Sequence, residues 1–299
     1  MDDLPALPIL EVPSLLNSPS LTHIYDLPEE LIVNILRRLY SDHLARSRVV
    51  SKTFSDISTK VRSVNLLCPL DRYTNSGRRP TPFKIIITDL ILSTGDVDSI
   101  SIGVEERANH KSLDVKLDDL YLTEVSFVYR WLKRVCGGLT SLSISDYRMH
   151  SRRKWSEVLS LISFHCKNLH ELVLKNAWLS TNGLSSAMLM LTSLTLEFVR
   201  LDDEDLDKVN SCCPSLQILN LILVEGLKNP QIDLLHLRTY HYVGFRVETT
   251  AWLPLIRAPH LTSYEVGFGR GIDEISRLEF GLDPVVYRPR SITFVRPPH

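Results

Sequence analysis

Few residues in this 299-residue chain have the types and spacing that catalysis or metal binding requires. The acidic run 202–207 has the alternating aspartates of a calcium-binding loop. Such a loop also needs a glycine at its sixth position and a bidentate glutamate at its twelfth, and Lys208 and Pro214 stand there instead. We interpret the run as the start of a helix with Asp202 or Asp203 as its cap, because acidic side chains stabilise the positive end of a helix.

The other candidates for chemistry are equally weak. The glycine-rich segment 267–271 has no well-capped helix after it to hold a phosphate, and His165 and His170 are spaced wrongly for one helix face. No phosphate-binding loop, zinc-protease motif or hydrolase nucleophile motif is present. We therefore predict that the chain is not an enzyme and has no catalytic residues, no metal site and no cofactor.

The five cysteines are an odd number without a C-x-x-C pair, which argues against a disulfide framework and against zinc. Cys136, Cys166 and Cys213 each stand three residues before a leucine of a repeated phrase. A small thiol at a fixed phase of a repeat is typical of a packing residue.

That phrase is the main feature of the sequence, and it occurs nine times. The six clearest copies read Leu-x-x-[Leu or Tyr]-x-[Leu, Ile, Val or Tyr] and begin at Leu139, Leu169, Leu191, Leu216, Leu237 and Leu261. Their spacing is close to the roughly 20 to 29 residues of leucine-rich repeats. Because such a unit cannot bury its apolar face alone, the copies should stack into a curved solenoid that serves binding.

The predicted fold class is α/β, with a small N-terminal three-helix unit followed by an irregular leucine-rich-repeat solenoid. Its parallel strands should form the concave face, with helices such as 123–136 and 154–165 on the convex face. Weaker copies at Val61/Val64/Leu66 and Val97/Ile100/Ile102 precede the clear ones, and Ile292 with Phe294 would form the ninth strand. We assign 97–299 to the repeats, 67–96 to a linker and irregular first repeat, and 1–23 to a disordered tail.

Composition sets further limits. An apolar content of 44% supports a large core, and the charges nearly balance, with 34 basic and 35 acidic residues. With so small a net charge, we expect no long-range electrostatic attraction of the chain to nucleic acid or anionic lipid. No stretch approaches about 18 uncharged apolar residues, and acidic Asp2 and Asp3 stand where a secretory signal needs positive charge. We expect a location in the nucleus and/or cytoplasm.

Residues 24–66 have helical instead of strand periodicity. Asp26 and Glu29 have capping-box spacing, with Pro28 in the first turn. Leu31, Ile35 and Leu39 make one apolar stripe, and Ile32 and Leu36 make a second beside it. A second helix should begin at Ser41 or Asp42, and a third near Ser51 with Phe54, Ile57 and Val61 on one face. So short a unit leaves apolar surface uncovered.

The segments 27–39 (Leu-Pro-Glu-Glu-Leu-Ile-Val-Asn-Ile-Leu-Arg-Arg-Leu) and 44–54 (Leu-Ala-Arg-Ser-Arg-Val-Val-Ser-Lys-Thr-Phe) resemble an F-box. The chain departs from the family pattern at Phe54, where tryptophan is usual, and at Ser51, where cysteine is common, so the aromatic anchor is kept with less area. An F-box followed by irregular repeats is similar to the F-box/LRR substrate receptors that are numerous in plants.

The resemblance implies a substrate-recognition adaptor of an SCF-type ubiquitin ligase. Its F-box would bind a Skp1-type protein, and through it a cullin and RING ligase, while the solenoid holds an unknown target protein for ubiquitination by other chains. The residues we expect at the Skp1-type contact are Leu27, Pro28, Leu31, Ile35, Leu39, Val49 and Phe54. No nucleic-acid or membrane partner is expected.

Alternation along each strand should point the residues between the leucines onto the concave face. The expected substrate-binding residues there are Lys175, Glu197, Asn220, His241 and Glu265. Two alternatives remain open: an interaction scaffold or decoy that recruits no ligase, and a small-molecule receptor, for which the sequence marks no pocket.

Overall fold

A computed structural model describes residues 27–70, 73, 81–105, 118–147, 154–245, 255–269 and 292–293. The predicted tail 1–23, the capping residue Asp26, Gly271 and Phe294 lie outside these ranges. The helices are α1 Glu29–Leu36, α2 Ser41–Val50, α3 Lys52–Ser58, α5 Phe83–Ser93, α6 Val125–Val135, α7 Val158–His165 and α8 Asp203–Cys212, with the 3-10 turn η2 Asp118–Leu120. The strands are β1 Ser63–Pro69, β2 Ser99–Glu105, β3 Ser141–Ser145, β4 Trp155–Ser156, β5 Glu171–Lys175, β6 Trp178–Leu179, β7 Ser193–Glu197, β8 Ile218–Ile222, β9 Gln231–Asp233, β10 Thr239–Phe245, β11 Leu255–Arg257, β12 Ser263–Gly269 and β13 Ile292–Thr293.

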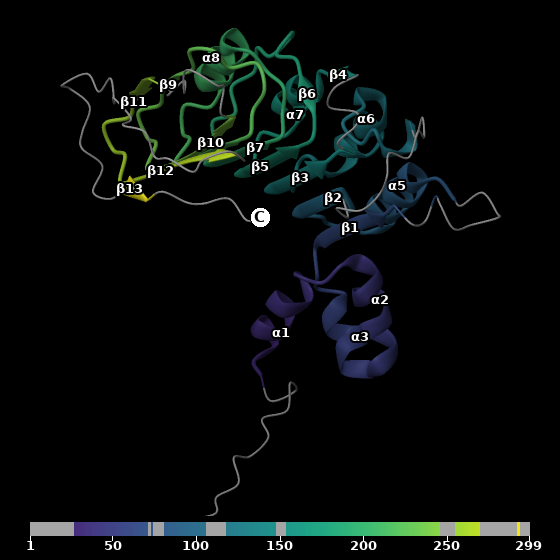
Figure 1. Ribbon diagram of the computed structural model, residues 1–299. Helices are drawn as coiled ribbons and strands as arrows, with labels where there is room; N and C mark the ends of the chain where they lie inside the picture. Colours follow the sequence, from purple (N-terminus) through teal and green to yellow (C-terminus); the bar gives the residue numbers. More distant parts are fainter. Residues whose placement is uncertain are drawn as a thin grey trace, which may run out of the picture.

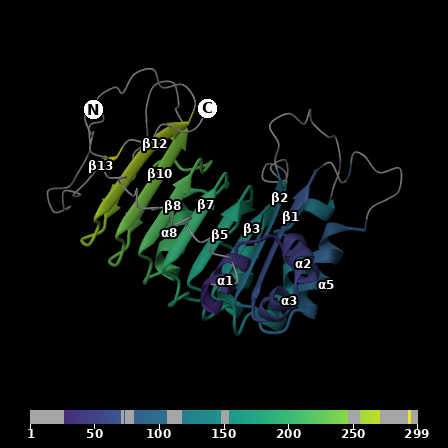
Figure 2. The same cartoon turned by 90° about the horizontal axis from the view of Figure 1, so that it is seen from below.

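One nine-stranded sheet runs through the molecule in the order β1-β2-β3-β5-β7-β8-β10-β12-β13. Each of its strand pairs is parallel, because the chain returns behind the sheet after every strand. Figure 1 shows α5, α6, α7 and α8 on one side of this sheet, and Figure 2 shows the strands side by side from the opposite side. The nine apolar phrases thus supply nine strands, which confirms the predicted α/β solenoid.

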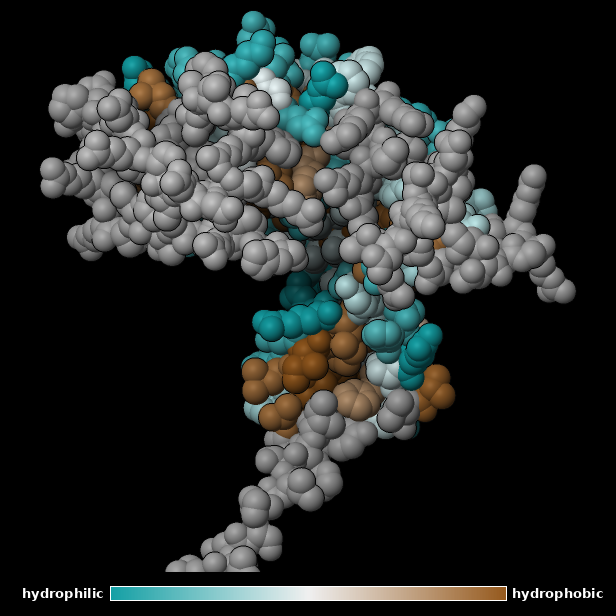
Figure 3. Space-filling model, in the orientation of Figure 1, coloured by the Kyte–Doolittle hydropathy of each residue, from teal (hydrophilic) through white to brown (hydrophobic). Residues whose placement is uncertain are grey.

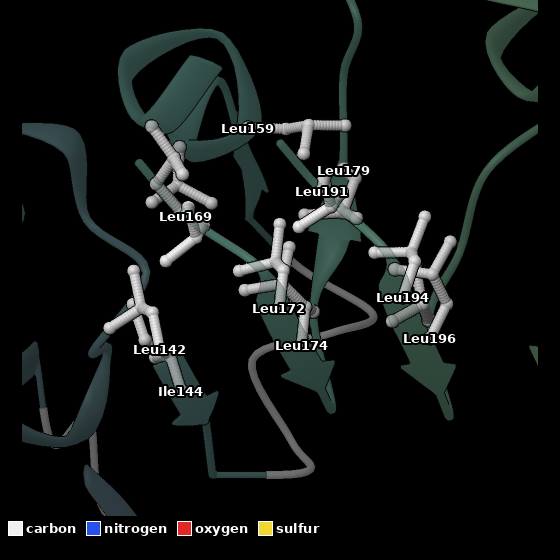
Figure 4. Close-up of a cluster of buried hydrophobic side chains, with 14 of the residues drawn as sticks. Leu142, Ile144, Leu159, Leu169, Leu172, Leu174, Leu179, Leu191, Leu194 and Leu196 are labelled. Carbon is white, nitrogen blue, oxygen red and sulfur yellow. The ribbon is translucent and has the colours of Figure 1, made fainter. Parts of the chain in front are cut away.

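The core is built from the repeated leucines. Leu142, Leu172 and Leu194 lie opposite one another on successive strands, and so do Ile144, Leu174 and Leu196. All six side chains are fully buried, and Figure 4 shows them stacked from strand to strand. Burying each such side chain stabilises the fold by about 1.5–3 kcal/mol, which makes the stack the main source of stability.

The turn that precedes each strand repeats as well. The carbonyl of the residue three positions before the repeat leucine accepts its N–H, at 3.2 Å for Cys213 and Leu216 and at 3.1 Å for Ala258 and Leu261. Cys166 occupies the same phase, and both thiols are buried. Burial raises the pKa of Cys166 and of Cys213 to about 12, so these thiols stay protonated and serve packing.

The convex side differs from the prediction in one place. Helix α6 lies within the predicted range 123–136, but helix α7 begins at Val158 and not at Lys154. The difference arises because Trp155 forms the short strand β4, which pairs with Trp178 of β6. The Ser156 hydroxyl then accepts the N–H of Val158 at 3.1 Å and starts the helix.

Sharp corners follow the middle strands of the sheet. Asn176, Phe198 and Leu223 have φ near +55°, at 57°, 52° and 50°. The N–H of each still bonds to the neighbouring strand, as from Phe198 to Ile222 O at 2.8 Å. The left-handed residue turns the chain behind the sheet, where Trp178, Arg200 and Glu225 form a second parallel ladder.

The acidic run is a helix start, as the sequence predicts. The Asp202 carboxylate caps α8 by accepting the Asp205 N–H at 2.8 Å. Asp203 accepts the N–H of Lys228 at 3.1 Å, and Asp205 accepts the Thr181 hydroxyl. These carboxylates tie neighbouring repeats together.

The three N-terminal helices form a separate small unit with its own core of Ile32, Leu36, Leu44, Ile57 and Val61. Helix α1 begins after Pro28. Helix α3 ends at Ser58, so Val61 lies beyond the helix that was predicted to contain it, although it remains buried.

The sheet begins earlier than the predicted boundaries. Strand β1 begins at Ser63, inside the predicted segment 24–66, and α5 lies within the predicted segment 67–96. Residues 71–72 and 74–80 of the predicted linker lie outside the described ranges. In the described residues no helix is both long and apolar enough to cross a membrane.

Candidate protein-docking surfaces

Helix α1 carries its two apolar stripes next to each other, about 100° apart around the helix axis. Ile32 and Leu36 are buried in the small core. Leu31 and Ile35, which we call the outer stripe, are 49% and 42% exposed. Since the three helices are too few to cover both stripes, the outer stripe is apolar surface without a cover in the described chain.

The other residues predicted for this surface fall into two groups. Pro28 is exposed, and Val49 near the end of α2 is 87% exposed. Leu27, Leu39 and Phe54 are half-buried and pack against the small core. Leu27, Leu39 and Phe54 therefore belong partly to the small core and partly to the exposed surface.

Local contacts fix how the three helices of this unit are joined. The Ser51 hydroxyl caps α3 by accepting the N–H of Phe54 at 3.1 Å, so the start of α3, with Phe54, is fixed directly after α2. An ion pair between Lys60 and Glu29 joins the end of α3 to the start of α1. Figure 3 shows that apolar side chains gather on the outside of this unit.

Sequence reasoning missed one residue of this surface. Tyr40 stands between α1 and α2 and is exposed, with its ring edge-on to His43 at 6.0 Å. Tyr40 directly follows Leu39 of the predicted stripe, and this neighbouring position in the sequence could have indicated that it belongs to the surface. An exposed tyrosine suits a docking surface, because it combines apolar area with a polar group.

The second candidate surface is the concave face of the sheet, which we define as the side chains that alternate with the buried leucines. Lys175 and Glu197 lie opposite each other on β5 and β7 and form an ion pair at 2.5 Å. The two predicted contact residues thus neutralise each other, so neither presents a lone charge.

Asn220, His241 and Glu265 lie opposite one another on β8, β10 and β12. The Asn220 amide donates to the Thr195 hydroxyl at 2.9 Å. Within the described part of the chain, His241 Nε2 has no hydrogen-bond partner. All five predicted concave residues are half-buried, and the structure brings three of them into one row.

Apolar and small side chains complete the concave face. Ile218, Ile222 and Val243 flank the row of Asn220 and His241 with apolar area. The first strands instead present Ser99, Ser101 and Gly103 on β2 and Ser141, Ser143 and Ser145 on β3. This small polar floor was missed, although the alternating serines in the sequence signalled it.

The described residues contain no group of three His, Cys, Asp or Glu side chains that could hold a metal ion. Burial raises the pKa of Asp146 to about 7, but this carboxylate lies in the core and accepts the N–H of Leu122 and Thr123. Its role is to anchor the chain that leads into α6.

Comparisons with known proteins agree with this division. The F-box domain family matches residues 24–65, and the family "FBD-associated F-box protein At5g56370, LRR repeats" matches residues 116–264. A curated relative, the F-box/LRR-repeat protein At4g29420 of Arabidopsis thaliana, is 49% identical over 224 residues. That alignment covers 73% of this chain and 50% of the relative, so the chain spans about half the length of the curated relative that it matches.

The small helical unit is an F-box, and the sheet with its returns is a leucine-rich-repeat solenoid. The chain belongs to the F-box/LRR-repeat proteins.

Proposed function

We propose that this protein is the substrate-recognition adaptor of an SCF-type ubiquitin ligase. The F-box binds a Skp1-type protein through the outer stripe, Pro28 and Val49, and thereby joins a cullin and RING ligase. The solenoid binds a target protein on its concave face. The chain performs no catalysis itself and acts by holding the target near the ubiquitin-charged enzyme.

The observation that supports this proposal is the uncovered outer stripe. Leu31 and Ile35 are exposed on a helix that is held in the unit by buried Ile32 and Leu36, so they can be covered without unfolding the unit. Apolar side chains of this kind, once buried at the centre of an interface, contribute most of the binding free energy. F-box domains generally bind Skp1-type adaptors, which names the partner.

The concave face supports the second half of the proposal. Its mixture of an ion pair, a polar row and isoleucines resembles the composition of a protein interface more than that of a small-molecule pocket. We assign Lys175, Glu197, Asn220, His241 and Glu265 to target binding, with Ile218 and Ile222 as apolar neighbours.

The test is binding of the purified full chain to a purified Skp1-type protein, measured by calorimetry. The double variant Leu31→Asp/Ile35→Asp should lower affinity by a factor of about 30 or more, since the loss of even one hot-spot residue costs about 2 kcal/mol or more. Helix α5 of the solenoid offers a matched control, because Ile85 and Leu92 are 47% and 46% exposed there. The double variant Ile85→Asp/Leu92→Asp should bind like the unaltered chain.

Two results would contradict the proposal. If the unaltered chain does not bind the Skp1-type protein, the chain is a scaffold or decoy instead of a ligase adaptor. If both double variants bind equally well, the outer stripe is not the docking surface. Circular dichroism of each variant shows whether its helices remain folded.

A further inference from the structure

The F-box and the solenoid have separate apolar cores. Val61 belongs to the core of the F-box, whereas Val64 belongs to the core that continues through the solenoid. The division falls within three residues of the chain, and no buried apolar cluster of the described residues spans it. Units joined in this way move relative to each other unless other contacts hold them.

Polar contacts cross this junction. The Arg37 guanidinium, at the end of α1, donates to the Asp98 carboxylate at 2.7 Å, between residues 61 positions apart in sequence. The Ser63 hydroxyl donates to the Arg37 carbonyl at 3.3 Å, and the Asn65 N–H donates to the Ser41 hydroxyl at 3.0 Å. Of these, the Arg37–Asp98 contact is the charged one, and charge-assisted hydrogen bonds are the stronger kind.

The backbone of Asp98 is fixed on the solenoid side. Its N–H donates to Arg62 O at 2.9 Å, where the chain enters β1. Its carbonyl accepts the N–H of Thr140 at 2.8 Å and the Thr140 hydroxyl at 2.9 Å. The N–H of Ser141, at the start of β3, bonds to the same carbonyl at 3.1 Å. The carboxylate therefore extends from a point that is held by the first three strands of the sheet.

We propose that Asp98 is a positioning residue that acts through Arg37 to hold the F-box in one orientation relative to the solenoid. This proposal rests on the proposed adaptor function, since the Arg37–Asp98 contact would set the orientation of the Skp1-docking surface relative to the concave face. Figures 1 and 2 show the F-box below the β1 end of the sheet, on the side opposite the helices. A target on the concave face and a ligase on the F-box then keep a constant separation.

The reason is geometric. Between the end of α3 at Ser58 and the start of β1 at Ser63 the chain has four residues, 59–62. Small rotations in this segment would swing the outer stripe of α1 through a wide arc. Arg37 lies at the C-terminal end of that same helix, so its bond to Asp98 restrains the helix directly.

The experiment measures the distance between two spin labels on the full chain by pulsed electron paramagnetic resonance. The labels are carried by non-natural amino acids at exposed Asn34 on α1 and exposed Ser211 on α8, which leaves the native cysteines untouched. The labelled chain should give one narrow distance peak. Asp98→Ala and Arg37→Ala should each lose this peak in favour of a broad distribution.

Asp96 provides the matched control, because it is also an aspartate of this loop and pairs with Arg62 at 3.4 Å, but its side chain is 86% exposed. Asp96→Ala should keep the narrow peak, since exposed pairs contribute little. The exchange Arg37→Asp/Asp98→Arg should partly restore it. If Asp98 and Arg37 acted only as local structural residues, this exchange would not restore the narrow peak. Thermal melting shows whether each variant is folded.

A narrow peak that survives in folded Asp98→Ala and Arg37→Ala would overturn the proposal. The measurement needs neither a Skp1-type protein nor a target. Its failure is therefore distinguishable from failure of the proposed function, which is tested by the binding of the outer-stripe variants.

Discussion

The F-box and the solenoid differ in how completely they bury their apolar side chains. The F-box core has five buried residues, and the same helix that contributes two of them leaves Leu31 and Ile35 open to solvent. In the described residues, the solenoid has one large buried cluster that extends from Val64 to Tyr264. The difference arises because each repeat has neighbours to cover it, whereas a three-helix unit has too little chain to cover itself.

This comparison separates two kinds of residue that look alike in the sequence. A leucine of the solenoid contributes to folding, whereas a leucine of the outer stripe contributes little to folding and is available for a partner. Substitutions of the same chemical type should therefore have different consequences in the two regions.

The largest effect is expected for Leu172→Ala in the middle of the solenoid. Removal of this fully buried side chain should lower the free energy of unfolding by about 2–5 kcal/mol, because it leaves a cavity. Leu36→Ala makes the same change in the five-residue core and should unfold the F-box while the solenoid still unfolds near its original urea concentration. Urea denaturation followed by circular dichroism measures both effects.

Val173→Ala is the control for Leu172→Ala, because Val173 is the half-buried neighbour on the concave face. A single shared unfolding transition in the Leu36→Ala variant would show that the two cores are coupled, and would contradict the claim that the F-box and the solenoid are stabilised separately.

A smaller effect is expected for the buried carboxyl of Asp146. Burial raises its pKa from 3.8 to about 7 in the folded chain, against the opposing effect of the N–H groups and the Thr123 hydroxyl that donate to it. Between about pH 4 and pH 7 the folded chain keeps a proton that the unfolded chain has lost. Stability from this group is therefore full below about pH 4 and falls as pH rises to 7, by up to about 1.4 kcal/mol per pH unit.

Asp146→Asn removes the titration while keeping the shape of the side chain. Urea denaturation at several pH values should show the stability difference, unaltered chain minus variant, decreasing between pH 4 and pH 7. A difference that is constant with pH would mean that Asp146 does not titrate in this range.

The smallest effect is expected for Lys175→Ala on the concave face. The side chain is 37% exposed and pairs with Glu197, so its loss should change the free energy of unfolding by only about 0–1 kcal/mol. A loss as large as that of Leu172→Ala would show that the concave face contributes to folding and is not reserved for binding.

Much of this architecture could be predicted from the sequence, because the repeated phrase fixes strand position, register and burial together. The strands at Leu142, Leu172 and Leu194 follow from the phrase, and the division of α1 into the Ile32 and Leu31 stripes follows from the helical period of residues 24–66. Both depend on local periodicity, which a single sequence contains.

The rest depends on contacts between distant residues. The late start of α7 follows from the pairing of Trp155 with Trp178, which lie outside the repeated phrase. The contact between Arg37 and Asp98 joins two units whose relative placement no periodic pattern specifies. Such features require the pairing of segments outside the phrase and the path of the junction.

The most direct test of the central claim is hydrogen–deuterium exchange of the full chain with and without a saturating Skp1-type protein. A docked F-box opens less often, so its amides should exchange more slowly. The account predicts slower exchange in α1 and α2 and unchanged exchange in β5, β7 and β8. Slower exchange in the concave strands, or no change in α1 and α2, would contradict it.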